Sequence, residues 1–85
     1  MDKIIVEVKC PASAKSYEFR ISKKLAVSEG TEKIISEIRG FEQNKRIFSK
    51  DSGLSLFCGR LGNILNADMS FAENGVRSGD MLMII

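Results

Sequence analysis

The spacing of the apolar residues changes from that of strands to that of a helix in the first half of this chain, and the change limits the folds that the chain can adopt. Apolar residues first alternate with polar ones in two short stretches, 3–9 and 17–21, as they do in strands that bury one face. Between these stretches, Pro11 cannot donate to a strand ladder, which favours a turn. The pattern predicts an antiparallel hairpin. Its inward residues would be Ile4, Val6 and Val8 in the first strand, and Tyr17, Phe19 and Ile21 in the second.

A helical spacing follows the hairpin. The apolar positions recur at steps of four and three residues, which is the spacing of one helix face. Ser28 is the expected N-cap, and Gly40 is the expected end of the helix. Gly30, in the first turn, costs about 1 kcal/mol relative to alanine. The predicted buried face consists of Val27, Thr31, Ile34, Ile35, Ile38 and Phe41.

The second half of the chain contains shorter strand patterns. Strands are predicted at 54–58, 64–65 and 81–85, with turns at 59–63 and 78–80. One helix on one face of a mixed sheet of four to five strands is an α+β architecture, and the whole of 1–85 fits a single domain.

Two segments of this half are less regular. Residues 65–76 fit a short strand, a loop and one helical turn. Residues 42–53 allow a helix extension, an extra strand or a packed loop.

The composition narrows the function. A net charge of +2 from 13 basic and 11 acidic residues, interspersed and without a basic stripe, does not predict nucleic-acid binding. Nothing approaches the roughly 20 apolar residues of a membrane span, and no signal peptide is apparent, so we expect a cytoplasmic protein without membrane insertion.

The side chains that usually carry chemistry are sparse. The chain has no histidine, which excludes the Ser-His-Asp and Cys-His arrangements of hydrolases. Cys10 and Cys58 lack the close spacing of a metal site, and Cys58 reads as a buried small hydrophobic residue. Asp80 sits in a turn, where its expected role is to accept hydrogen bonds from nearby amides. We therefore expect neither catalysis nor a metal or cofactor.

The closing segment carries a family resemblance. Residues 72–76 (Ala-Glu-Asn-Gly-Val), then 78–80 (Ser-Gly-Asp), then alternating Leu82 and Ile84 resemble the end of a ubiquitin-like domain, most closely the bacterial YukD-type proteins. The resemblance implies the β-grasp arrangement, with the last strand central and parallel to the first. The chain ends on Ile84 and Ile85 instead of the Gly-Gly of modifiers, so we expect no conjugation.

The same resemblance implies a function. YukD-type proteins accompany type VII (WXG100, ESX-like) secretion, so the expected role is an accessory or regulatory protein-interaction module. Its partner would be a component of the secretion apparatus, and it would act in the cytoplasm, free or docked at the inner face of the cell membrane. Two alternatives remain: a modifier or carrier processed from a longer precursor, and a regulatory domain excised from a larger protein.

Strand alternation predicts where a partner would bind. If Ile4, Leu82 and Ile84 face the helix, their neighbours in sequence face away from it. Such residues would form an apolar docking patch, on the sheet face that ubiquitin uses for binding. The alternatives are scattered surface apolar residues, or cover by 42–53. The predicted patch consists of Ile5, Phe57, Met81, Met83 and Ile85.

Overall fold

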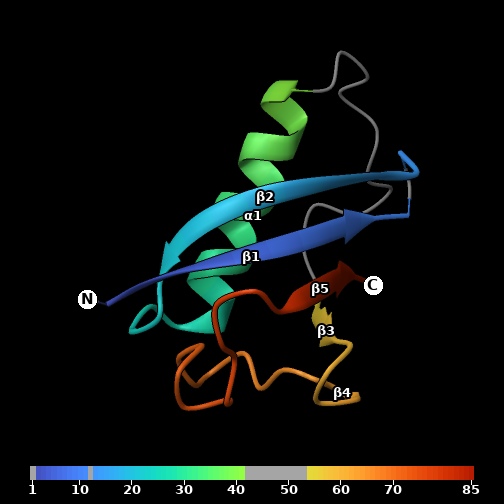
Figure 1. Ribbon diagram of the computed structural model, residues 1–85. Coiled ribbons are helices and arrows are strands. Elements are labelled where there is room, and N and C mark those ends of the chain that lie inside the picture. The colour runs from blue at the N-terminus through green and yellow to red at the C-terminus, as the bar shows by residue number, and fades with distance from the viewer. Residues whose placement is uncertain (1, 12, 42–53) are drawn as a thin grey trace.

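The computed structural model describes residues 2–11, 13–41 and 54–85, so the interpretations of 42–53 lie outside the described residues. One helix packs on one face of a five-stranded mixed sheet, which confirms the predicted α+β class (Figure 1). The order across the sheet is β2-β1-β5-β3-β4. The strands are β1 (Lys3–Cys10), β2 (Lys15–Ser22), β3 (Leu56–Cys58), β4 (Asn63–Ile64) and β5 (Met81–Ile84).

The first two strands form the predicted hairpin. They pair antiparallel over their full length, from Lys3 opposite Ser22 to Cys10 opposite Lys15. Burial alternates strictly along β1, because the residues that face α1 are removed from water while the others stay exposed. The buried residues of the hairpin are Ile4, Val6, Val8, Cys10, Phe19 and Ile21.

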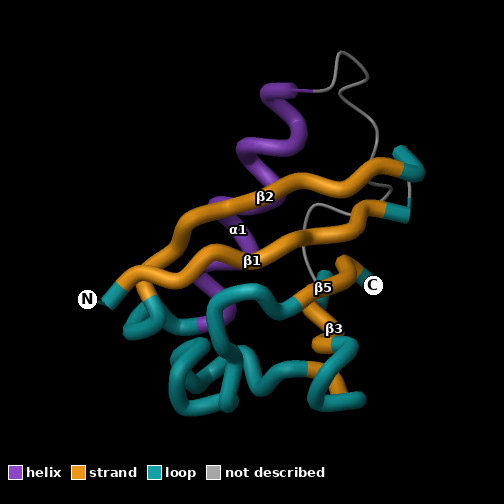
Figure 2. The backbone as a smooth tube through the Cα atoms, in the orientation of Figure 1, coloured by secondary structure: helices purple, strands orange, loops and turns teal. Residues whose placement is uncertain are grey.

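The last strand, β5, lies in the middle of the sheet. It is parallel to β1, with Leu82 beside Val8, and antiparallel to β3, with Leu82 beside Cys58. Figure 2 shows the long loop that brings the chain back to this central position. The sequence-based expectation of a central last strand parallel to the first is confirmed.

The helix α1 spans Val27–Phe41, and both of its predicted ends are wrong. Ser28 is not the N-cap, because the helix already includes Val27, whose amide donates to the Met69 carbonyl at 2.9 Å. The Ser28 amide donates to the Ala67 carbonyl at 3.0 Å, so a neighbouring loop satisfies the first amides of the helix. Gly40 does not end the helix, which continues through Phe41.

Phe41 does not belong to the buried face of α1. Its side chain is 65% exposed, whereas Ile34 and Ile38 are almost fully buried. The Phe41 ring instead stacks on Tyr17, with ring centroids 5.9 Å apart and an interplanar angle of 14°. The last turn of α1 extends beyond the sheet core, and the aromatic contact with β2 replaces burial there.

The strand boundaries in the second half differ slightly from prediction. β3 begins at Leu56 rather than at residue 54, although Ser55 and Ile85 still exchange two backbone hydrogen bonds of 3.0 Å. β4 comprises Asn63 and Ile64, one residue earlier than predicted. The turn before it is confirmed, and Gly62 adopts a φ of 72° that favours glycine.

The loop before β5 contains the predicted single helical turn, in which the Asn74 amide donates to the Ser70 carbonyl four residues earlier at 3.0 Å. Ser70 and Glu73 exchange hydrogen bonds of 3.0 Å, each side chain accepting from the other's amide. Hydrogen bonds to the Glu73 carboxylate, first from the Ser70 amide and then from the Ser70 side chain, lower its pKa from the ordinary value of 4.5. Within this loop Phe71 is fully buried, and a β-carbon built on Gly30 of α1 would lie only 2.4 Å from its Cε2 atom. Gly30 is therefore the place where the ring passes close to the helix backbone.

Candidate functional site

The outer face of the sheet, opposite α1, carries a row of apolar side chains. Met83 of β5 lies beside Phe57 of β3, which lies beside Ile64 of β4. Met83 and Phe57 are half-buried, and Ile64 is 55% exposed. We call Met83, Phe57 and Ile64 the apolar row.

The other predicted patch residues lie at different distances along the sheet. Met81 is one pleat from Met83 on β5, and Ile85, 48% exposed, follows the same strand at its other end. Ile5 is set apart, because Glu7, and not Ile5, is the β1 residue beside Met81. The structure thus brings four of the predicted residues together and displaces Ile5.

Ile64 was missing from the predicted patch. Its side was not assigned because the hairpin of β3 and β4 is short, and a shift of one residue reverses the face. Ile64 is paired with Phe57, and this pairing places the Ile64 side chain on the outer face of the sheet.

Charged side chains adjoin the apolar row on β1 and β2. Glu7 lies directly opposite Glu18, and both are exposed. Lys9 lies beside Met83, and Arg20 lies opposite Ile5. The outer face therefore has an apolar half on β5, β3 and β4 and a charged half on β1 and β2.

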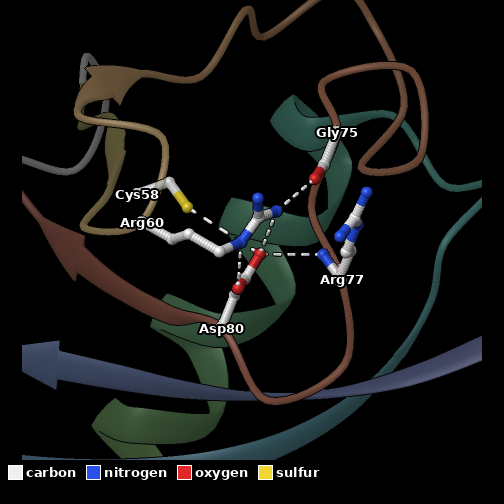
Figure 3. Close-up of polar contacts among 5 residues, drawn as sticks. All are labelled: Cys58, Arg60, Gly75, Arg77 and Asp80. Carbon is white, nitrogen blue, oxygen red and sulfur yellow. Dashed lines mark hydrogen bonds and ion pairs between the residues drawn. The ribbon is translucent and has the colours of Figure 1, made fainter.

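The buried carboxylate of Asp80 connects the turn before β5 with the turn between β3 and β4. Asp80, 7% exposed, precedes β5, and its Oδ1 atom lies 2.7 Å from the Nε atom of Arg60 (Figure 3). The Arg60 Nη2 atom donates to Asp80 Oδ2 at 2.9 Å and to the Gly75 carbonyl at 2.6 Å. The amide of Arg77 also donates to Asp80 Oδ2, at 2.8 Å.

These contacts fix the charge of Asp80. Its pKa is lowered from the ordinary value of 3.8, chiefly because Arg60 donates hydrogen bonds to the carboxylate; burial acts in the opposite direction. The same hydrogen bond raises the pKa of Arg60. The expected hydrogen bond from a nearby amide to the Asp80 carboxylate is present and comes from Arg77, but the sequence did not indicate Arg60, which lies 20 residues away.

The Cys58 thiol has the buried environment that the sequence predicts for it. Cys58 is fully buried, as predicted, and its Sγ atom is 4.0 Å from Asp80 Oδ2. Cys10 is also buried, and both cysteines are free. Among residues 2–11, 13–41 and 54–85, no group of three or more cysteine or acidic side chains lies close enough to hold a metal ion. In the same ranges, no helix has the length and apolar character needed to cross a bilayer.

The strand order, the central parallel β5 and the single covering helix define a ubiquitin-like β-grasp fold. No family model and no curated protein sequence matches the chain. Among solved structures, the ubiquitin-like domain of an Arabidopsis thaliana protein matches with a TM-score of 0.67 and 20% identity, over 100% of this chain and 78% of that one.

Two further matches have higher TM-scores. The EccD5 ubiquitin-like domain from Mycobacterium xenopi has a TM-score of 0.78 and 12% identity, over 100% of this chain and 94% of that one. A chain of the MycP5-free ESX-5 inner membrane complex has a TM-score of 0.79 and 18% identity. The match covers 100% of this chain and 21% of that one. At these identities the likeness establishes the fold.

Proposed function

We propose that this chain is a ubiquitin-like interaction module that binds a protein through the outer face of its sheet and catalyses no reaction. The apolar row carries this proposal. Met83, Phe57 and Ile64 lie side by side across β5, β3 and β4, on the sheet face that α1 does not cover.

The chemistry of the row suits binding. Contiguous exposed apolar side chains lose contact with water when a partner covers them, which favours association. Methionine side chains are flexible and polarisable, so Met83 and Met81 can adapt to a partner's shape. The Asp80–Arg60 pair joins the turn before β5 to the turn between β3 and β4, at one end of these strands, and a surface preorganised in this way has less entropy to lose on binding.

The proposed partner is a component of a type VII (WXG100, ESX-like) secretion apparatus, which the module serves as an accessory or regulatory part on the cytoplasmic side of the membrane. The resemblance of 72–85 to YukD-type proteins supports this assignment, as do the two ESX-related structures among the matches.

A second candidate is a regulatory domain of a longer chain. The specific observation in its favour is that the match covers only 21% of the chain in the ESX-5 inner membrane complex, so that chain is much longer than the matched region.

Co-purification of the tagged protein with type VII membrane components tests the proposal. Met83→Asp should reduce the recovery of that component at least about tenfold, because a charge in the apolar row must be desolvated on binding. Met69→Asp is the matched control, since Met69 is also partly exposed (36%) but lies in the loop before β5.

The outcomes separate the two parts of the proposal. If the parent protein recovers no type VII component, the assigned partner is wrong. If Met83→Asp recovers as much as the parent, the apolar row is not the binding surface. If Met69→Asp reduces recovery equally, the effect of Met83→Asp is one of net charge and the row loses its support.

A further inference from the structure

A hollow of about 500 Å³ surrounds the displaced residue Ile5, at the end of the outer face away from the apolar row. Ile5 itself is 38% exposed. The lining consists of Asp2, Lys3, Ile5, Arg20 and Ser78.

The turn before β5 leaves this space open. The Gly79 amide donates to the Ile5 carbonyl at 2.7 Å, which places a residue without a side chain beside Ile5. A β-carbon built on Gly79 would meet no atom within 4 Å, and the φ of 93° there favours glycine. The residue bonded to the Ile5 carbonyl therefore has no side chain that could cover Ile5.

Hydrogen-bond donors surround the apolar side chain of Ile5. Arg20 lies directly opposite Ile5 across the hairpin, and Lys3 is the next outward residue on β1. Both are exposed, and neither side chain forms a hydrogen bond or ion pair with another of the described residues. The Ser78 hydroxyl oxygen accepts from the Ile5 amide at 3.0 Å, so its own proton is directed elsewhere and can be donated.

The anions nearby restrict where a ligand's charge can sit. Asp2 is the one acidic residue in the lining, and its carboxylate already accepts from the Ser22 hydroxyl at 3.5 Å. Glu7 and Glu18 lie one pleat further along β1 and β2, directly opposite each other. A carboxylate is thus favoured beside Lys3 and Arg20 and disfavoured toward Met81.

We propose that this hollow, which we call the Ile5 hollow, binds an acidic peptide segment of a partner protein: an apolar side chain rests on Ile5 while an adjacent Asp or Glu pairs with Arg20 and Lys3. A guanidinium and a carboxylate form two parallel hydrogen bonds, so Arg20 supplies orientation as well as charge. This site is distinct from the apolar row and does not depend on the identity of the secretion partner.

Amide chemical shifts of the full chain, measured during titration with short peptides, test the proposal. The probe is the capped peptide Gly-Asp-Leu-Phe-Asp-Gly, and its control is Gly-Asn-Leu-Phe-Asn-Gly, which has the same shape without the charges. Saturable shifts are expected at Ile5, Arg20 and Ser78. The control peptide should bind on the order of tenfold more weakly, because it loses the charge-assisted bonds.

Two variants localise the effect. Arg20→Gln should weaken binding of the acidic peptide by about the same factor, whereas Lys9→Gln should not change it. Lys9 is an exposed, outward residue of β1, as Lys3 is, but it lies beside Met83, two pleats from Ile5, so its substitution removes one positive charge from the same face outside the hollow.

Several results would overturn the inference. These are the absence of saturable shifts at millimolar peptide, equal binding of the two peptides, equal loss in Arg20→Gln and Lys9→Gln, and shifts confined to Met83 and Phe57. None of these results bears on the co-purification experiment with Met83→Asp, so the two proposals fail independently.

Discussion

Replacing Gly30 by alanine tests the close contact between α1 and the loop before β5. The added β-carbon would lie 2.4 Å from Phe71 Cε2 and 2.6 Å from Cζ, far inside the roughly 3.5–4.0 Å at which carbon atoms pack favourably. Phe71 has no exposed surface, and its amide donates to the Leu25 carbonyl at 3.2 Å. The ring therefore has little room to retreat.

The expected magnitude is a balance of two terms. Overpacking a well-filled core costs about 1–3 kcal/mol, and alanine in place of glycine inside a helix returns up to about 1 kcal/mol. Gly30→Ala should thus lower the free energy of unfolding by up to about 2 kcal/mol, and each kcal/mol should lower the melting temperature by about 4–8 °C in a domain of this size.

Gly40 supplies the matched control within the same helix. A β-carbon there would meet no atom within 4 Å, so Gly40→Ala should raise the free energy of unfolding by about 0.5–1 kcal/mol. Urea unfolding followed by circular dichroism measures both changes. In a Phe71→Leu background the cost of Gly30→Ala should shrink, because the smaller side chain leaves room. If Gly30→Ala stabilises the domain as Gly40→Ala does, the inferred steric conflict is refuted.

Three further predictions address the core, the strand register and the buried carboxylate. Ile38→Ala should cost about 2–5 kcal/mol in urea unfolding, because Ile38 is fully buried between α1 and the sheet; a melting temperature within a few degrees of the parent would contradict this. Leu82→Asp should unfold the domain and Met83→Asp should leave it folded by circular dichroism, since only Leu82 faces α1; the reverse result would mean an inverted register. Because the pKa of Asp80 is lowered below 3.8 in the folded protein, its contribution to stability is present above that pH and is lost as the pH falls further. Asp80→Asn should therefore be less stable than the parent near neutral pH, with a difference that shrinks on acidification in thermal melts; a difference independent of pH would rule out this role.

The elements that periodicity describes well are those whose burial is one-sided. β1 alternates strictly because α1 covers one of its faces, and the helical spacing from Val27 to Ile38 survives for the same reason. The helix ends were mispredicted because their determinants are not local. The carbonyls of Ala67 and Met69 satisfy the first amides of α1, and a Tyr17 ring accompanies its last turn. No rule based on caps within the helix could have identified them.

The predicted patch shows a similar division. Alternation alone placed Met81, Met83 and Phe57 on the face away from α1, and the burial pattern of β5 agrees. Alternation could not show which residue of β5 lies beside Ile5, because that depends on the offset between β1 and β5. That offset puts Glu7 beside Met81 and leaves Ile5 next to the turn at Gly79.

Asp80 connects this offset to the rest of the outer face. Its carbonyl accepts from the Glu7 amide at 3.0 Å, which sets β5 against β1, while its carboxylate binds Arg60 in the turn between β3 and β4. One residue thus aligns Met83 with Phe57 on one side and separates Ile5 from Met81 on the other. The apolar row and the Ile5 hollow are consequences of the same register. Asp80→Asn weakens the contacts of the carboxylate with Arg60 and with the Arg77 amide, so it should disturb both the turn between β3 and β4 and the turn that carries Ser78 and Gly79 beside Ile5.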